Sequence, residues 1–185
     1  MDRLSATIQN SFSSKKIVIV GDMVADQFLH GTIARVSREA PVFILRHDET
    51  DTRAGAAANA AVNVASLGAE PLLIGLAGVD ENGELLLDSL RRVGVNCDFV
   101  VSEAYLKTTT KIRVLAGQHY AARQQVIRID YENTSAIGES TRTLLLSNLE
   151  NAAGKADAII ISDYNYGVVD GNLYDLARRI ATERS

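Results

Sequence analysis

The sequence predicts an α/β protein built on a doubly wound, mainly parallel sheet. Apolar strand-like runs alternate with segments of helical periodicity between residues 16 and 182, and this order favours parallel strands joined by right-handed crossovers. Two polar strand-like segments, 26–32 and 41–48, break the alternation directly after the first strand, so we expect them to form a small side sheet. The chain has 185 residues, of which 46% are hydrophobic, and it shows no internal repeat. We therefore expect one domain spanning 1–185.

The first half of the chain is predicted to contribute two strands and two helices to the main fold. They are expected as a strand at 16–20, a helix at 56–67, a strand at 72–77 and a helix at 81–93. The first strand is a short apolar run that ends at Gly21. Each helix is closed by a glycine, Gly68 or Gly94, because glycine adopts the left-handed conformation that ends a helix at least cost. Asp80 precedes the second helix and is expected to cap it.

The second half is predicted to continue the pattern with more strands and two further helices. β-Branched residues favour strands at 99–101, 108–116 and 124–131, followed by a helix at 137–153, a strand at 158–161 and a helix at 172–182. The run from Ala158 to Ile161 is apolar without interruption. A strand of this kind is typical of a sheet that is covered on both faces.

Charge and composition exclude several classes of partner. A net charge of −4 and a pI near 5.4 give no electrostatic reason to bind nucleic acid or an anionic membrane surface. The single cysteine, Cys97, excludes an intrachain disulfide and fits a reducing compartment. No apolar run reaches membrane-spanning length, and the first fourteen residues lack the apolar core of a signal peptide. The histidines are not spaced as metal ligands. We expect a cytoplasmic protein without a metal site formed by its histidines.

A run of small residues from 53 to 68 is the strongest indication of a ligand. Gly55 and the alanines after it leave the N–H groups at the start of a helix accessible, which favours anionic or polar ligands. Asn59 and Asn63 are four residues apart and share one helical face. Their amides both donate and accept hydrogen bonds, as sugar hydroxyls require. The alternative is a small-residue helix packed tightly against a sheet, with Asn63 bonded to a neighbouring backbone group.

Segments on both sides of this run give the chain a family resemblance. They are Ile17–Asp22, Ser37–Val42, Gly75–Asp80, Thr110–Leu115, Gln125–Asp130 and Ser162–Tyr164. The sequence resembles the ribokinase-like (PfkB) carbohydrate kinases from about residue 17 to residue 180. Within them it is most similar to the heptose 7-phosphate kinases, because Ser-Arg-Glu-Ala-Pro-Val and Thr-Lys-Ile-Arg-Val-Leu are more specific than the Gly/Asn run. The resemblance covers the front half of such a kinase, so we expect a ribokinase-like fold truncated at its C-terminus.

The resemblance implies an activity, a lid and a set of cofactors. It implies ATP-dependent phosphorylation at C1 of a heptose 7-phosphate, in ADP-heptose and lipopolysaccharide core precursor biosynthesis, with ATP and Mg²⁺ as cofactors and a sugar phosphate as the small-molecule partner. Segments at about 26–48 and 108–131 would form a small β lid over the sugar. The catalytic residues are expected beyond residue 185, so the chain is expected to be an incomplete fragment. A non-catalytic sugar-phosphate-binding module and another ribokinase-like sugar kinase remain alternatives.

Candidate substrate-binding residues lie at strand ends and on two neighbouring strands. Asp22 follows the first strand, and ligands of open α/β sheets bind at the carboxyl ends of strands; the resemblance implies that Asp22 and Asn59 hold the sugar. Lys111 and Arg113 are two apart and point to one face, where they would bind the resident phosphate. A turn cap is the alternative for Asp22, and a solvated strand face is the alternative for the cations. The full set is Asp22, Arg38, Glu39, Gly55, Asn59, Lys111, Arg113, Gln125, Arg128 and Asp163.

Three features set this chain apart from the family pattern. Ala56 stands where these kinases commonly have a second glycine, so a positive φ there would be strained. Tyr166 stands near the position where the heptose kinases are expected to have a lysine. The chain is expected to lack the strand into which the helix at 172–182 would lead, so the strand at 158–161 is expected at an uncovered sheet edge, and such edges invite association. We therefore expect self-association through this edge or a homodimer through the lid.

Overall fold

A three-stranded parallel sheet lies at the centre of the fold. The computed structural model describes residues 11–117, 122–133 and 135–183, and it begins with a short 3-10 helix, η1 (Phe12–Ser14). The central sheet has the order β4-β1-β9, formed by β4 (Glu70–Ile74), β1 (Lys16–Gly21) and β9 (Ala158–Ser162). Both neighbours of β1 run parallel to it. This confirms the predicted α/β class.

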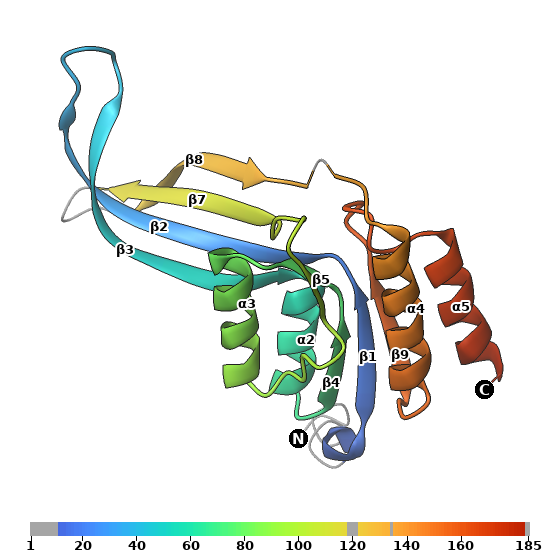
Figure 1. Cartoon of the computed structure of the whole chain (residues 1–185). Helices are drawn as coiled ribbons and strands as arrows, with labels where there is room; N and C mark the ends of the chain where they lie inside the picture. The colour runs from blue at the N-terminus through green and yellow to red at the C-terminus, as the bar shows by residue number, and fades with distance from the viewer. Residues whose placement is uncertain (1–10, 118–121, 134, 184–185) are drawn as a thin grey trace.

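Helices cover both faces of the central sheet (Figure 1). One face carries α2 (Ala57–Ser66) and α3 (Glu81–Arg92), and the other carries α4 (Glu139–Ala153) and α5 (Gly171–Glu183). Successive side chains of β1 alternate between the two layers, as a strand requires. Ile19 packs with the buried residues of α2 and α3, whereas Val18 and Val20 pack with those of α4 and α5. The arrangement is the doubly wound fold that the alternating sequence predicts.

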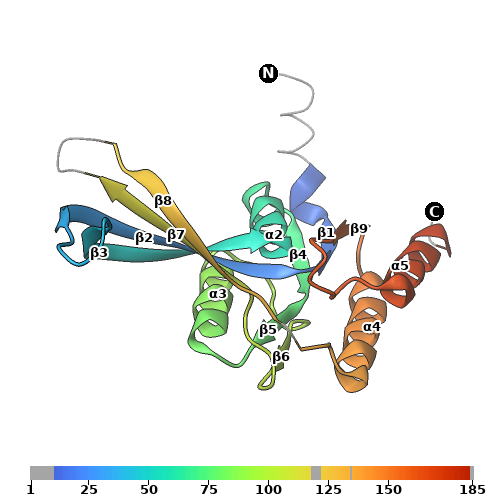
Figure 2. The ribbon, with the colours of Figure 1, turned by 90° about the horizontal axis from the view of Figure 1, so that it is seen from above.

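A second sheet projects from the end of the central sheet where β1 ends, as Figures 1 and 2 show. Its strands are β2 (Met23–Val36), β3 (Phe43–Ala56), β7 (Thr110–Gly117) and β8 (Gln124–Tyr131), in the order β3-β2-β7-β8. We call it the side sheet. β2 runs antiparallel to β3 and parallel to β7, while β7 and β8 are antiparallel. The segments expected at 26–48 and 108–131 thus share one sheet.

The strands β2 and β3 are much longer than the short segments 26–32 and 41–48 expected from the sequence. Each has fourteen residues, because their pairing continues through register shifts at His30/Gly31 and Ile33/Arg35. Such irregularities let a strand bend without ending. The polar residues that follow 41–48 are therefore part of the strand and not of a loop.

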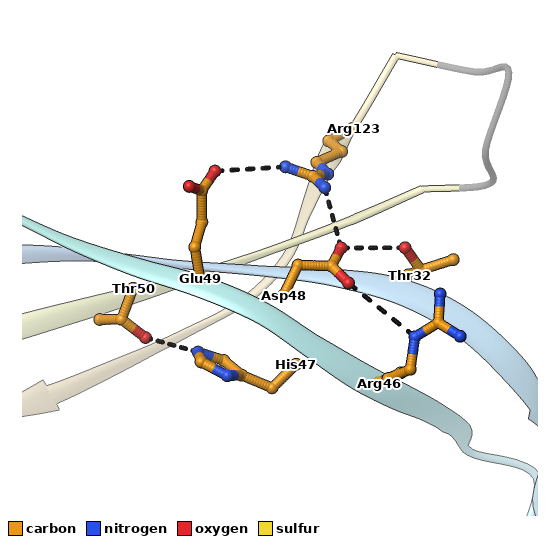
Figure 3. A network of polar contacts seen from close by, with 7 residues as sticks. All are labelled: Thr32, Arg46, His47, Asp48, Glu49, Thr50 and Arg123. Atoms are coloured by element: carbon orange, nitrogen blue, oxygen red, sulfur yellow. Dashed lines mark hydrogen bonds and ion pairs between the residues drawn. The ribbon is translucent and has the colours of Figure 1, made fainter.

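Polar contacts join the two edge strands of the side sheet (Figure 3). Arg123, just before β8, lies 2.8 Å from Asp48 and 3.7 Å from Glu49, both on β3. Thr32 on β2 donates a hydrogen bond of 2.9 Å to Asp48, and His47 contacts the hydroxyl of Thr50. Because β3 and β8 are opposite edges of the sheet, the two contacts of Arg123 reach from the start of one edge strand to the other.

Three strands differ from the sequence-based expectation. The strand expected at 72–77 breaks at Gly75, where an added Cβ would lie 2.5 Å from the sulfur of Met23. Its second part, β5 (Leu76–Gly78), pairs with β6 (Val101–Glu103), so the strand expected at 99–101 begins two residues later. Ile159 and Ile161 of β9 pack against the layer of α4 and α5, but Ile160 is 39% exposed, so the prediction of cover on both faces was wrong for this residue. β9 lies at an edge of the central sheet, as predicted.

Helix ends follow the sequence signals closely. Gly68 and Gly94, two residues after the last residues of α2 and α3, have φ values of +91° and +83°, which confirms their expected role in ending these helices. Asp80 caps α3, because one carboxylate oxygen accepts a hydrogen bond of 2.9 Å from the N–H of Gly83. The other accepts one of 2.9 Å from the N–H of Thr108. Asp80 therefore ties the start of α3 to the segment that leads into β7.

Replacing Asp80 with alanine is expected to destabilise the fold and to flatten its pH dependence. Burial by itself raises the pKa of Asp80, but hydrogen bonds from Thr108 and Gly83 and the charge of Lys107 outweigh it and leave the pKa below its ordinary value. A lowered pKa adds stability above the ordinary value near 4, and this stability is lost as the pH falls through the folded-state pKa.

Urea denaturation at pH 7 and pH 3 measures both effects. We expect Asp80→Ala to cost about 1–2 kcal/mol at pH 7 and less at pH 3. Asp88→Ala is the matched control on the same helix, because its exposed carboxylate pairs with the exposed side chain of Arg91. Equal losses for Asp80→Ala at the two pH values would contradict this prediction.

Candidate functional site

A pocket of about 360 Å³ lies between the side sheet, the start of α2 and the loop after β9. It is open to solvent at the end of the fold where ligands of α/β sheets bind. Its lining combines charged, amide and aromatic side chains with the backbone of a glycine. The lining residues are Val24, Asp26, Phe28, Arg53, Ala54, Gly55, Ala56, Asn59, Lys111, Arg113 and Tyr164. Four candidates from the sequence, Gly55, Asn59, Lys111 and Arg113, are brought together here.

The pocket is positively charged although the chain is acidic. Arg53, Lys111 and Arg113 contribute three cations to its lining, whereas Asp26 contributes one carboxylate. The whole chain has a net charge of −4. Concentrated positive charge in a concave site attracts anions, and guanidinium groups bind phosphate oxygens in pairs. The pocket is therefore suited to an anionic ligand.

Strand register places the two predicted cations of β7 on one face. Lys111 is opposite Asp26, and Arg113 is opposite Phe28, in the parallel pairing of β2 with β7. Lys111 and Arg113 both line the pocket. This confirms that the two side chains point the same way, as their spacing of two residues predicts.

Gly55 lets Asp26, the acidic side chain in the pocket lining, lie close to the backbone. The guanidinium of Arg113 lies 2.5 Å from a carboxylate oxygen of Asp26. A Cβ at Gly55 would lie 2.7 Å from the other oxygen of Asp26, closer than real Cβ contacts allow. A side chain at position 55 would displace Asp26 and, with it, the partner of Arg113. The glycine is thus required for the arrangement of charges.

The start of α2 contributes backbone and amide groups to the pocket. Ala57, Ala58 and Ala61 are fully buried against the central sheet, so the small residues of this helix pack tightly, which was the alternative interpretation. Asn59 lies on the outer side of the same helix, exposed and in the pocket lining. The tight packing of the alternative interpretation is therefore confirmed for one face of α2, and ligand binding by the other face stays a prediction.

Ala56 has the strained backbone that the sequence comparison with the family suggested. Its φ of 54° and ψ of −127° lie in a region that non-glycine residues rarely adopt. The conformation directs the chain from β3 into α2, and the N–H of the next residue, Ala57, donates a hydrogen bond of 2.8 Å to the carbonyl of Asp22. Strain of this kind costs about 1–3 kcal/mol per residue.

Replacing Ala56 with glycine is therefore expected to stabilise the protein. Glycine removes the strain but adds about 0.5–1 kcal/mol of chain entropy to the unfolded state, so we expect a net gain of about 1 kcal/mol. Thermal and urea denaturation measure the change. Ala60→Gly, inside α2, is the control and should destabilise by about 1 kcal/mol. A loss of stability in Ala56→Gly would show that the alanine is not strained.

The carboxylate of Asp22 lies under the loop that follows β9. Asp22 is 1% exposed, and its two oxygens accept hydrogen bonds from the N–H groups of Tyr164, Tyr166 and Val168 at 2.8, 3.1 and 3.1 Å. It does not belong to the pocket lining. The contacts observed match the capping alternative, and sugar binding by Asp22 stays a prediction.

This loop brings two tyrosines to the pocket region. Tyr164 lines the pocket, and the ring centre of Tyr166 lies 5.4 Å from Nζ of Lys111. The ring of Tyr166 thus contacts the side chain of a lysine that lines the pocket. Asp163 is exposed and accepts a hydrogen bond of 2.8 Å from the N–H of Asn165. This contact corresponds to its alternative role as a cap of the loop.

Four other candidates lie away from the pocket lining. Arg38 and Glu39 are exposed in the connection between β2 and β3, beside a separate hollow. An extended strand rises about 3.3 Å per residue, so the nine steps from Asp26 to Arg35 alone span roughly 30 Å. Gln125 and Arg128 are exposed on β8. Arg128 is opposite Arg113 in the sheet and pairs with Asp130 at 2.9 Å.

Four pocket residues with charged or aromatic side chains were not identified as candidates from the sequence: Asp26, Phe28, Arg53 and Tyr164. Arg53 could have been identified from the sequence, because it lies two residues before Gly55 and therefore on the same face of the strand. Asp26 and Phe28 have no such signal. They lie in a strand of mixed polarity, and their position depends on the pairing of β2 with β3 and β7.

The side chains that line the pocket determine whether it could hold a metal ion. Mg²⁺ prefers carboxylate oxygens, and the pocket lining supplies one carboxylate, which is paired with Arg113. Within residues 11–117, 122–133 and 135–183, no group of three or more His, Cys, Asp or Glu side chains could hold a metal ion. The pocket itself therefore does not fit Mg²⁺.

In the same part of the chain, none of the helices has the length and apolar character needed to cross a membrane.

Comparison with known sequences gives matches along most of the chain. The family described as pfkB family carbohydrate kinase matches residues 14–185. The bifunctional protein HldE of Koribacter versatilis is 37% identical over 163 residues, which are 88% of this chain and 32% of that protein. The HldE protein of Vibrio cholerae serotype O1 is 39% identical over 159 residues, or 86% of this chain and 32% of that protein. The chain thus spans about a third of the length of these curated relatives.

Solved structures share the fold at low sequence identity. Phosphofructokinase-2 from Escherichia coli, in complex with substrates and products, superposes with a TM-score of 0.63 at 19% identity, over 91% of this chain and 51% of that one. Ribokinase from Arabidopsis thaliana, complexed with ribose and ATP, gives 0.60 at 17% identity, over 90% and 51%. These likenesses confirm a ribokinase-like fold.

Proposed function

Because this chain belongs to the pfkB family of carbohydrate kinases, we propose that its pocket binds the sugar substrate of such a kinase, and that this sugar is a heptose 7-phosphate. The reaction would be ATP-dependent phosphorylation at C1, in ADP-heptose and lipopolysaccharide core precursor biosynthesis. The heptose assignment is supported by the segments Ser37–Val42 and Thr110–Leu115, which resemble the heptose kinases, and by the identity with HldE proteins.

One observation carries the choice of a phosphorylated sugar. Arg53, Lys111 and Arg113 line a single pocket in a chain with an excess of acidic residues. A sugar without a phosphate has no charge for these cations to bind, whereas a phosphate presents several acceptor oxygens to guanidinium and ammonium donors. The positive pocket thus favours a sugar phosphate over a neutral sugar.

The remaining lining groups suit the sugar itself. Asn59 would donate to and accept from hydroxyl groups, and Tyr164 would cover an apolar face of the sugar. The side sheet would act as the lid, since Lys111 and Arg113 reach the pocket from its strand β7. Phosphoryl transfer in this family implies ATP and Mg²⁺. The pocket residues would hold and orient the acceptor sugar for that transfer.

Calorimetry with three ligands tests the proposal on the whole chain. Heptose 7-phosphate is expected to bind at least about tenfold more tightly than the same heptose without its phosphate, because one charge-assisted hydrogen bond contributes about 1.5–3 kcal/mol. Fructose 6-phosphate tests whether the sugar part is also recognised. Equal affinity for heptose with and without phosphate would overturn the assignment, and a preference for fructose 6-phosphate would favour another sugar kinase of the family.

A further inference from the structure

Two arginines of the pocket contact the same aromatic ring. Cζ of Arg53 lies 5.0 Å from the ring centre of Phe28, and Cζ of Arg113 lies 5.4 Å from it. The two arginines come from different strands, β3 and β7, which flank β2 on either side. All three side chains line the pocket. Phe28 is thus the point at which guanidinium groups from both neighbouring strands meet.

Each arginine is also held by one carboxylate. Arg113 lies 2.5 Å from Asp26, and Arg53 lies 2.6 Å from Asp51. A guanidinium has five N–H donors in a planar fork, and each of these ion pairs engages one nitrogen. An aromatic ring attracts a cation without accepting these N–H bonds along the plane of the fork. The contacts therefore orient both guanidiniums and leave donor capacity for a ligand with several acceptor oxygens.

We propose that Phe28 is a positioning residue that holds Arg53 and Arg113 as a pair for one phosphate group, and so determines the preference for a phosphorylated sugar. The inference rests on the proposed function and deepens it, because it assigns the phosphate to these two arginines. Arg53 is thus added to Lys111 and Arg113, the two cations that the sequence predicts to bind the phosphate. Lys111 has a separate aromatic support in Tyr166, at 5.4 Å.

The position of Phe28 argues against a purely structural role. The described residues form two buried apolar clusters, one on each face of the central sheet, and Phe28 belongs to neither of them. Its ring lies on the side sheet, half-buried and in contact with the two cations. Removal of the ring should therefore act on the arginines more than on the core.

Ligand binding by three variants of the whole chain tests this role. Cation–π contacts contribute about 0.5–1 kcal/mol each at exposed sites, so Phe28→Leu is expected to weaken binding of heptose 7-phosphate about fivefold. Binding of unphosphorylated heptose should change less than about twofold by the same reasoning. Phe28→Tyr keeps the ring and should restore affinity. Phe43→Leu is the matched control, because Phe43 is 60% exposed and lies outside the pocket lining.

A double-mutant comparison separates positioning from general packing. In a background with Arg53→Gln and Arg113→Gln, the further change Phe28→Leu should have no effect on heptose 7-phosphate binding, since its two partners are gone. Thermal denaturation of each variant shows whether it remains folded.

The outcomes distinguish the two proposals. Loss of affinity in Phe28→Leu that persists without the arginines, or equal losses for heptose with and without phosphate, would overturn the role of Phe28 alone. An unchanged affinity in Phe28→Leu would also overturn the role of Phe28, and it would leave the proposed function standing. Wild-type chain that binds heptose 7-phosphate no better than heptose would instead overturn the proposed function.

Discussion

Replacing Asp22 with alanine is expected to lower the free energy of unfolding by about 3 kcal/mol or more, the largest stability effect that we predict for one side chain. The carboxylate is almost fully buried and accepts three backbone hydrogen bonds, from Tyr164, Tyr166 and Val168. Without it, three N–H groups of the loop after β9 lose their acceptor. Unpaired buried donors are costly because neither protein nor water satisfies them.

Urea denaturation at neutral pH measures this loss. Asp163→Ala is the matched control, because Asp163 belongs to the same loop but is exposed and accepts a single hydrogen bond from Asn165. We expect the control to cost less than about 1 kcal/mol. A similar small loss for Asp22→Ala would mean that the loop finds other acceptors.

Replacing Arg113 with glutamine is expected to weaken the binding of heptose 7-phosphate about 10- to 100-fold, the largest effect on affinity that we predict. Glutamine keeps the polarity and part of the length but removes the charge and the planar fork that binds phosphate oxygens. It also leaves Asp26 in the pocket without its ion-pair partner, so a negative charge near the ligand is no longer balanced.

Calorimetry at low and high ionic strength checks the electrostatic origin of this effect. Binding to wild-type chain should weaken with added salt, and the dependence should be smaller for Arg113→Gln, because salt screens charges. Arg91→Gln, on the exposed side of α3, is the control and should bind as the wild type does. An unchanged affinity in Arg113→Gln would place the phosphate elsewhere in the pocket or outside it.

The sequence by itself determined the elements whose signals are local. The helix ends at Gly68 and Gly94 and the cap at Asp80 depend on backbone conformation and on hydrogen bonds within one turn. The apolar run of β1 and the segment of β8, Gln124–Tyr131, have the composition of strands and lie where they were predicted. Lys111 and Arg113 share a face because alternation along a strand is itself a local property.

The tertiary structure decided which distant residues meet. The partners of Asp22 lie more than 140 positions later in the chain, and no short-range pattern specifies them. Phe28 lies between Arg53 and Arg113 only because β2 pairs with both β3 and β7 in one particular register. A shift of one residue would move each side chain to the other face. The lengths of β2 and β3 carry Arg38 far from the pocket for the same reason, since strand pairing, and not local composition, determined where these strands end.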